Sequence, residues 1–94
     1  MRIRWFRQAL LDLDEIETYI AEDSPAAAVD VVVKIIKAVS LLGSQQGIGR
    51  TGRVPETKEL IVPGLSYIVP YRVKNGEVQI LRVYHTSRKW PDRL

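Results

Sequence analysis

The spacing of apolar residues changes along the chain, and each change marks an expected element. Apolar residues alternate with arginines over residues 2–6 (RIRWF), which predicts a short first strand. From Ala9 onward they recur every three or four positions, which predicts an amphipathic helix with its acidic residues turned outward. The apolar line of this helix is Ala9, Leu13, Ile16 and Ile20. The acidic residues off that line are Asp12, Asp14, Glu15 and Glu22.

A second helix is expected directly after the first. Ser24 is placed as its N-cap, and Pro25 suits the first helical position, where its missing N–H costs nothing. Gly43 is a candidate for its C-terminal end. Its polar stripe is Asp30, Lys34 and Lys37. Its apolar residues spread around the rest and are Val29, Val32, Val33, Ile35, Ile36 and Val39. We expect the first helix and a sheet to cover this wide apolar surface, and a protein partner is the alternative cover for part of it.

The second half of the chain predicts β structure. Residues 57–62 (TKELIV) and 66–73 (SYIVPYRV) read as two strands, and Asn75-Gly76 joins the second of these to a third through a two-residue turn. Pro70 cannot donate a ladder hydrogen bond, so we expect a bulge or an unpaired stretch there. The predicted order of elements is strand, helix, helix, strand, strand, strand.

The Asn75-Gly76 turn also fixes a register for the last two strands. It places Tyr71 opposite Ile80 and Val69 opposite Arg82. The other expected pairs are Lys74 with Glu77, Val73 with Val78 and Arg72 with Gln79. One face of this hairpin then carries Tyr67, Val69, Tyr71, Val73, Val78, Ile80 and Arg82. The other face carries Ile68, Arg72, Leu81, Val83 and His85.

Composition narrows the class of protein. The chain has 94 residues, 46% of them hydrophobic and 27% charged, which predicts one small folded domain over residues 1–94. It has no cysteine, so disulfides and thiolate chemistry are excluded and a reducing compartment, the cytoplasm, is expected. No secretion signal is visible, and charged residues interrupt the most apolar stretch, so no membrane span is expected.

Charge is distributed unevenly along the chain. Residues 1–46 hold five Lys and Arg against seven Asp and Glu, a net charge of −2, whereas residues 47–94 hold nine against four, a net charge of +5. This pattern indicates either a basic contact face for an acidic partner or an ordinary solvated surface.

The glycine-rich segment 43–56 is expected to be a loop, and it lacks the Gly-Lys-Ser/Thr ending of a phosphate-binding loop. The best functional candidates near it are Arg50, Arg53 and Lys58.

Taken together, several segments give the whole chain a resemblance to the RelE/ParE superfamily of toxins from bacterial type II toxin–antitoxin modules. In chain order these segments are ALLDLDEIETYIAEDSPAAA, GRTGRV, TKELIV, SYIVPYRV and VQILRVYHTSRKWP. The resemblance implies an α+β fold of β-α-α-β-β-β order, with a helical hairpin packed on a small antiparallel sheet. It also implies inhibition of growth and neutralisation by a cognate antitoxin, with no cofactor, metal, membrane or small-molecule substrate.

Members of this superfamily differ in their cellular target. RelE-like members cut messenger RNA in the ribosome, and they typically carry a Lys-x-Lys pair on the first strand of the C-terminal sheet and an Arg after the first Tyr of the next strand. Here the first stretch begins at Glu59 and continues Leu60-Ile61-Val62, and Ile68 follows Tyr67. Because both departures remove cations that would stabilise a phosphate transition state, the resemblance favours the ParE-like branch, which poisons DNA gyrase without nuclease chemistry. Ribosome-dependent RNA cleavage is the alternative, so whether the chain is an enzyme stays open.

The two activities imply overlapping sites. A gyrase-binding surface would use Arg50, Arg53, Lys58, Arg82, His85, Arg88 and Trp90. A nuclease would use Arg50, Arg53, Lys58, Arg72, Arg82 and His85. The antitoxin would bind Val29, Val33 and Ile36 on the second helix.

Structural roles compete with these assignments. His85, the only histidine, could equally be a hydrogen-bonded residue at the end of a strand, and without a second His or Cys it gives little support to a metal site. Arg72 could anchor an acidic side chain of the first helix. Trp5 and Trp90 are of the type that packs in a core or at its rim.

Overall fold

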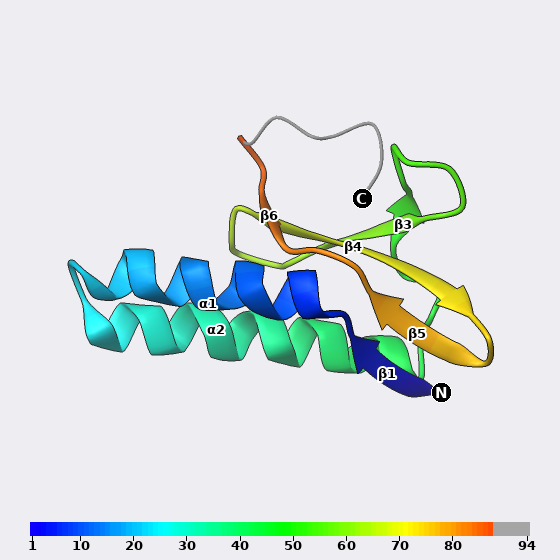
Figure 1. The fold of residues 1–94 in the computed structure, drawn as a ribbon, viewed down its shortest axis with the longest axis horizontal. Coiled ribbons are helices and arrows are strands. Elements are labelled where there is room, and N and C mark those ends of the chain that lie inside the picture. Colours follow the sequence, from blue (N-terminus) through cyan, green and yellow to red (C-terminus); the bar gives the residue numbers. More distant parts are fainter. Residues whose placement is uncertain (88–94) are drawn as a thin grey trace.

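The computed structural model describes residues 1–87, in which two helices lie side by side on one face of a sheet (Figure 1). The helices are α1 (Arg7–Ala21) and α2 (Pro25–Ser40), followed by a short 3-10 helix, Leu41–Gly43. The strands are β1 (Arg2–Trp5), β2 (Arg50–Thr51), β3 (Lys58–Ile61), β4 (Tyr67–Lys74), β5 (Glu77–Ile80) and β6 (Tyr84–His85). Neither helix in these residues is long and apolar enough to cross a membrane.

Local sequence signals set the start of each helix. The Ser24 hydroxyl accepts a hydrogen bond from the backbone N–H of Ala27 at 3.1 Å, and Pro25 opens α2, as the sequence predicts. Helix α1 begins directly after Phe6, two residues before the apolar pattern shows it. The expected helix end at Gly43 is wrong, because α2 ends at Ser40 and the chain tightens into the 3-10 helix before reaching Gly43.

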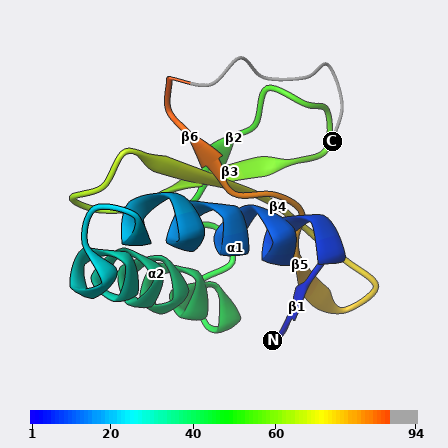
Figure 2. The same cartoon turned by 60° about the vertical axis from the view of Figure 1, so that its left-hand side comes forward.

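The sheet is mixed, with strand order β1-β5-β4-β3-β2 and β6 paired to β4 (Figure 2). The strands of the second half pair antiparallel, as expected, but β1 runs parallel to β5. This parallel pair joins residues from the two ends of the sequence, with Arg4 opposite Gln79. The N-terminal strand is thereby carried to the side of the C-terminal hairpin.

The hairpin between β4 and β5 follows the predicted register. Asn75 and Gly76 have φ angles of 54° and 72°, the left-handed values that a type I′ turn requires. Tyr71 lies opposite Ile80, and Arg72 lies opposite Gln79. The turn chemistry alone is therefore enough to specify this pairing.

Beyond Ile80 the register changes by one residue. The backbone N–H of Leu81 still bonds to the carbonyl of Pro70 at 3.0 Å, but β6 then places His85 opposite Tyr67. The irregularity predicted at Pro70 is confirmed in its place, but the extra residue lies on the facing strand, where residues 81–83 oppose residues 69–70. The predicted pair of Val69 with Arg82 is wrong. The extra residue reverses the alternation of side chains, so Val83 joins the helix-facing core and His85 lies on the side of Tyr67.

The main core lies between the helices and the sheet. Helices α1 and α2 contribute buried Ala9, Ile35, Ala38 and Val39. The sheet contributes buried Leu60, Val69, Tyr71, Val78, Ile80 and Val83. Leu13 and Ile16 of α1 pack against this core, which confirms the predicted apolar line. Within residues 1–87, the opposite face of the sheet carries no helix, and Arg4, Gln79 and Arg72 lie on it.

Candidate functional site

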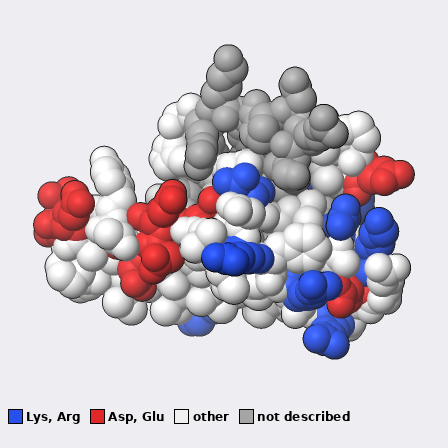
Figure 3. Space-filling model, viewed as in Figure 1, with Lys and Arg blue, Asp and Glu red and all other residues white. Residues whose placement is uncertain are grey.

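A basic surface covers the end of the molecule that holds β1. Strand pairing puts Arg4, Gln79 and Arg72 in one row across β1, β5 and β4, on the helix-free face of the sheet. Figure 3 shows most of the visible Lys and Arg over this end and most of the Asp and Glu over the far half of α1. This surface combines arginines from both halves of the chain. The net charge of +5 on residues 47–94 therefore indicated only its C-terminal part, and not the arginines of β1.

A cavity of about 530 Å³ opens in this surface, and we call it the arginine pocket. Its walls come from β1 and the start of α1, from the turn before β3, and from β4 and the chain after β5. The charged residues that line it are Arg4, Arg7, Arg72, Arg82 and Glu56. The remaining lining residues are Trp5, Phe6, Gln8, Val54, Pro55, Thr57 and Leu81.

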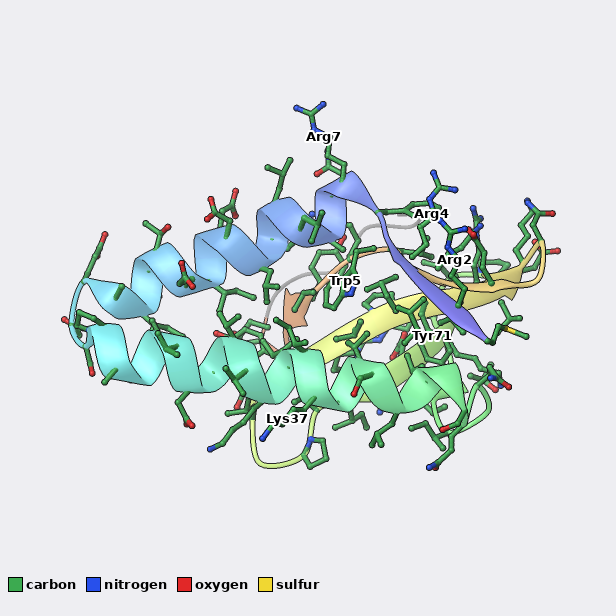
Figure 4. All side chains as sticks on the ribbon, turned by 90° about the horizontal axis from the view of Figure 1, so that it is seen from below. Arg2, Arg4, Trp5, Arg7, Lys37 and Tyr71 are labelled. Carbon is green, nitrogen blue, oxygen red and sulfur yellow. The ribbon has the colours of Figure 1, made fainter. Side chains whose placement is uncertain are left out.

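The arginines of this pocket differ in how far their charge is compensated. Arg4 reaches Glu77 only at 3.5 Å, and the Nε of Arg72 donates to the neutral amide oxygen of Gln79 at 2.6 Å. The guanidinium groups of Arg4 and Arg72 lie 5.1 and 5.7 Å from the centre of the Phe6 ring. Arg7 lines the edge of the pocket, with its side chain projecting outward from the start of α1 (Figure 4), and it forms no ion pair with any residue in 1–87.

Arg82 is the one arginine of the pocket with a strong partner. Its Nε and Nη2 donate to the two carboxylate oxygens of Asp12 at 2.7 and 3.0 Å, and the backbone N–H of Val83 donates to the same carboxylate at 3.0 Å. These hydrogen bonds raise the pKa of Arg82 above its usual value. The prediction that Asp12 lies on the outer face of α1 is wrong, because its exposed fraction is only 6%. The helix anchor expected of Arg72 is formed by Arg82.

Glu59 organises the predicted cluster around the glycine-rich segment. Its side chain is 1% exposed and accepts hydrogen bonds from Arg50 at 3.0 and 3.1 Å and from the backbone N–H of Arg53 at 2.8 Å. The Arg53 side chain lies 3.8 Å from the same carboxylate. A buried acid therefore offsets the charge of two of the three cations predicted there, while Lys58, next to it on β3, lies opposite Tyr71 on the other face of the sheet.

Tyr71 holds the glycine-rich segment against the sheet. Its hydroxyl donates to the carbonyl of Gln46 at 2.7 Å and accepts from the backbone N–H of Gly49 at 2.9 Å. Burial raises the pKa of Tyr71, and the hydrogen bond from Gly49 offsets part of that rise. A Cβ at position 49 would lie 2.5 Å from the tyrosine oxygen, so only glycine fits there. The expected loop is thus held to the sheet at Gln46 and Gly49, and the short strand β2 follows directly.

His85 lies in a different cavity from the arginines. Its Nδ1 accepts a hydrogen bond from the backbone N–H of Ser87 at 3.1 Å, and its ring stands edge-on to Tyr67 with centroids 5.3 Å apart. This second cavity, of about 570 Å³, is lined by Asp12, Glu15, Ile16, Tyr19, Tyr67, Val83, His85 and Ser87. None of residues 1–87 lines both this cavity and the arginine pocket. His85 is therefore a hydrogen-bonded residue at a strand end, surrounded by acidic and aromatic side chains.

The predicted antitoxin-binding residues form an exposed stripe along α2. Val29, Val33 and Ile36 are 58%, 41% and 45% exposed, and their spacing places them on one side of the helix.

Two of the predicted target-binding residues, Arg88 and Trp90, lie outside the described residues. Among residues 1–87, no three His, Asp or Glu side chains gather as metal ligands would.

Comparison with known proteins identifies the family. The model of the ParE toxin of the type II toxin–antitoxin system parDE matches residues 3–90. The chain belongs to this ParE toxin family. It is 45% identical over 93 residues to the "Putative toxin Y4kP" of Sinorhizobium fredii, covering 99% of this chain and 96% of the relative.

Two further similarities agree with membership of the ParE toxin family. Toxin RelE2 of Caulobacter vibrioides is 31% identical over 87 residues, covering 93% of this chain and 97% of that protein. A solved structure of the chromosomal ParDE toxin–antitoxin system from P. aeruginosa superimposes with a TM-score of 0.84 at 34% identity, covering 93% and 97% of the two chains. The fold and the superfamily expected from the sequence motifs are confirmed.

Sequence reasoning missed the N-terminal part of the basic surface. The sequence predicts Arg4 and Phe6 only as members of the first strand and assigns Arg7 to no element, because their position at this surface depends on the parallel pairing of β1 with β5. The alternation of arginines with apolar residues in RIRWF was the available signal, since it already places Arg2 and Arg4 on one face of a strand.

Proposed function

We propose that this ParE-family toxin inhibits growth by binding DNA gyrase and does not cleave RNA. The observation that carries the proposal is that, within residues 1–87, the arginines of the arginine pocket and His85 line different cavities. Cleavage of RNA requires a proton-transfer group and several cations at one phosphate. In residues 1–87, His85 lines one cavity and Arg82 another, and buried acids hold Arg82, Arg50 and Arg53.

The two positions at which the chain departs from RelE-like toxins strengthen this proposal. Glu59 is buried and binds two arginines, so a carboxylate lies where RelE-like toxins carry a lysine. Ile68, at the position of their arginine, is 4% exposed. At both positions this chain has a buried residue that stabilises the fold, whereas RelE-like toxins have a cation that can contact RNA.

The proposed gyrase contact combines the half-exposed arginines with the C-terminal segment. Arg50 and Arg53 keep about half of their side-chain surface in solvent at 49% and 48% exposure, so they can still contact a partner. We assign the strongest contacts to Arg88 and Trp90, because large and cationic side chains concentrate binding energy at interfaces. Lys58 lies opposite Tyr71 and His85 opposite Tyr67, on the helix-facing side of the sheet, so we give them only supporting positions at the edge of the proposed surface. Arg82 contributes through its structural role.

We also propose that a cognate antitoxin neutralises the toxin by covering the stripe of Val29, Val33 and Ile36. Three adjacent, half-exposed apolar side chains on one helix are a surface that an amphipathic segment covers. Acidic residues of that segment would be attracted to the basic surface around β1. The structural match to a ParDE system supports an antitoxin partner.

Two assays on one protein preparation test the target. The first follows supercoiling by purified gyrase, and the second follows cleavage of ribosome-bound messenger RNA. The proposal expects inhibition of supercoiling and no specific RNA cuts. Specific cuts that disappear in His85→Gln, with supercoiling untouched, would overturn it in favour of the RelE-like activity.

A further inference from the structure

The arginine pocket carries excess positive charge that the described part of the molecule does not neutralise. Arg82 is compensated by Asp12, and Arg4 only weakly by Glu77. Arg72 bonds to a neutral amide and Arg7 has no ion pair among residues 1–87. Two or more guanidinium groups with free N–H donors at one cavity constitute a site for an anion.

The shape and lining of the pocket indicate more than a bare anion. Its volume of about 530 Å³ lies within the range of small-molecule sites. Apolar side chains line much of it, and they are Trp5, Phe6, Val54, Pro55 and Leu81. The guanidinium groups of Arg4 and Arg72 already lie over the Phe6 ring, so the planar group of Arg4, whose side chain is 58% exposed, is the surface on which a flat ring can stack.

We propose that the arginine pocket binds a nucleotide, with the phosphate held by Arg7 and Arg72 and the base against the apolar wall. Arginine is the only cation among the described residues of the lining, and its planar, forked group suits bidentate contact with phosphate. The nucleotide can be free or part of a single strand, since both present a phosphate next to an unstacked base. This inference concerns a site on the toxin itself and does not depend on gyrase being its target.

The pocket is equipped for binding and not for cleavage. The part of its lining that falls in residues 1–87 contains four arginines, which stay protonated, and one carboxylate, that of Glu56, but no histidine or lysine. Glu56 lies at a Pro55-Glu56 turn with a positive φ of 65°, where it repels a bound phosphate and limits its affinity. Removing this charge should therefore strengthen binding, which a purely structural pocket would not show.

Titration calorimetry with the purified protein tests the proposal. The probes are adenosine diphosphate, adenosine, inorganic phosphate, a short single-stranded oligodeoxyadenylate and an oligoglutamate peptide. We expect adenosine diphosphate to bind about tenfold more tightly than adenosine or phosphate, because it contacts the arginines with its phosphates and the apolar wall with its base. Equal affinity for inorganic phosphate or for oligoglutamate would overturn the nucleotide assignment, as would the absence of binding at millimolar concentration.

Variants then place the site. Arg7→Gln and Arg72→Gln should each weaken nucleotide binding by about tenfold, and Glu56→Gln should strengthen it several-fold. Lys37→Gln is the matched control, because Lys37 is an exposed cation on α2 that does not line the pocket. Arg7 has no ion pair among residues 1–87, so its loss should leave the fold intact. An equal effect of Lys37→Gln and Arg7→Gln would show diffuse attraction and overturn the site.

The source of the nucleotide follows from the same titrations. An oligonucleotide that binds more tightly than the free diphosphate, with an affinity that falls steeply with salt, identifies a nucleic acid strand as the ligand. Tighter binding of the free diphosphate identifies a soluble nucleotide. Either result supports the pocket, provided that Arg7→Gln removes the difference in affinity between the oligonucleotide and the free diphosphate.

Discussion

Asp12 of helix α1 and Arg82 of the chain after β5 form the ion pair that ties the helices to the sheet. The carboxylate accepts two hydrogen bonds from the guanidinium group and a third from the backbone N–H of Val83. That third bond falls in the segment between β5 and β6 where the register changes by one residue. Asp12 thus satisfies the backbone at the bulge as well as the charge of Arg82.

Removing Asp12 should therefore destabilise the fold. Asp12→Ala leaves a partly buried guanidinium and a buried N–H without partners, so we expect a loss of about 3 kcal/mol in the free energy of unfolding measured with urea. The matched control is Asp30→Ala, which breaks the exposed Asp30–Lys34 pair and should cost about 0.5 kcal/mol or less. Similar losses for the two variants would contradict the anchoring role.

This role also bears on how toxicity of Arg82 variants is interpreted. Arg82→Ala removes the partner of buried Asp12, so it should lower stability as well as activity. Loss of toxicity in this variant is evidence for a target contact only if its unfolding midpoint is unchanged. We expect the midpoint to fall, which assigns Arg82 a structural function.

Two glycines that are close in sequence should respond differently to alanine. A Cβ at Gly49 meets the Tyr71 hydroxyl at 2.5 Å, whereas a Cβ at Gly47 meets nothing within 4 Å. Gly49→Ala should break the hydrogen bond between its N–H and Tyr71 and cost about 1–3 kcal/mol, and Gly47→Ala should be nearly neutral. Tyr71→Phe should reproduce most of the Gly49→Ala loss, and thermal unfolding of the three variants checks the set.

Glu56 holds a backbone conformation that disfavours it. With φ at 65° after Pro55, it occupies the position of a tight turn where glycine is preferred. Glu56→Gly should raise the free energy of unfolding by about 0.5–1 kcal/mol. The substitution relieves the strain of the left-handed conformation, and the greater flexibility of glycine in the unfolded chain offsets part of this gain. Glu56→Ala removes the same charge and keeps the strain, so a comparable gain in Glu56→Ala would rule out this explanation.

The sequence predicts those parts of the fold that depend on local rules. Ser24-Pro25 marks the start of α2, and Asn75-Gly76 fixes the β4–β5 register, because each signal acts within a few residues. The parallel pairing of β1 with β5 depends on contacts between the two ends of the chain, which no local pattern specifies.

The parts of the site that sequence missed have the same origin. Asp12 and Arg82 lie 70 positions apart, so a pattern of polar residues along α1 could not distinguish this buried acid from its exposed neighbours. Pro70 did indicate a bulge, but not its length. A shift of one residue was enough to move Val83 and His85 to the opposite face from the predicted one.

His85 should be dispensable for toxicity. A general acid or base contributes about 10²- to 10⁴-fold to a rate, so His85→Gln would abolish toxicity if His85 acted in catalysis. Its position beside Tyr67 and Ser87, away from the arginine pocket, leads us to expect toxicity close to that of the unmodified protein. Arg88→Ala and Trp90→Ala should reduce growth inhibition far more. Growth after controlled expression of each variant, at matched protein levels, provides the measurement.

Changes on α2 should separate neutralisation from toxicity. Val33→Asp places a charge in the middle of the apolar stripe that it forms with Val29 and Ile36, so antitoxin binding should weaken by a factor of about ten or more. The side chain at position 33 is exposed and outside both cavities, so the fold and the growth inhibition should persist. Lys34→Asp, one residue further along the same helix, serves as the control for added negative charge. Cells that carry both toxin and antitoxin should then stop growing with Val33→Asp and continue with Lys34→Asp, whereas equal rescue of the two variants would mean that the antitoxin binds elsewhere.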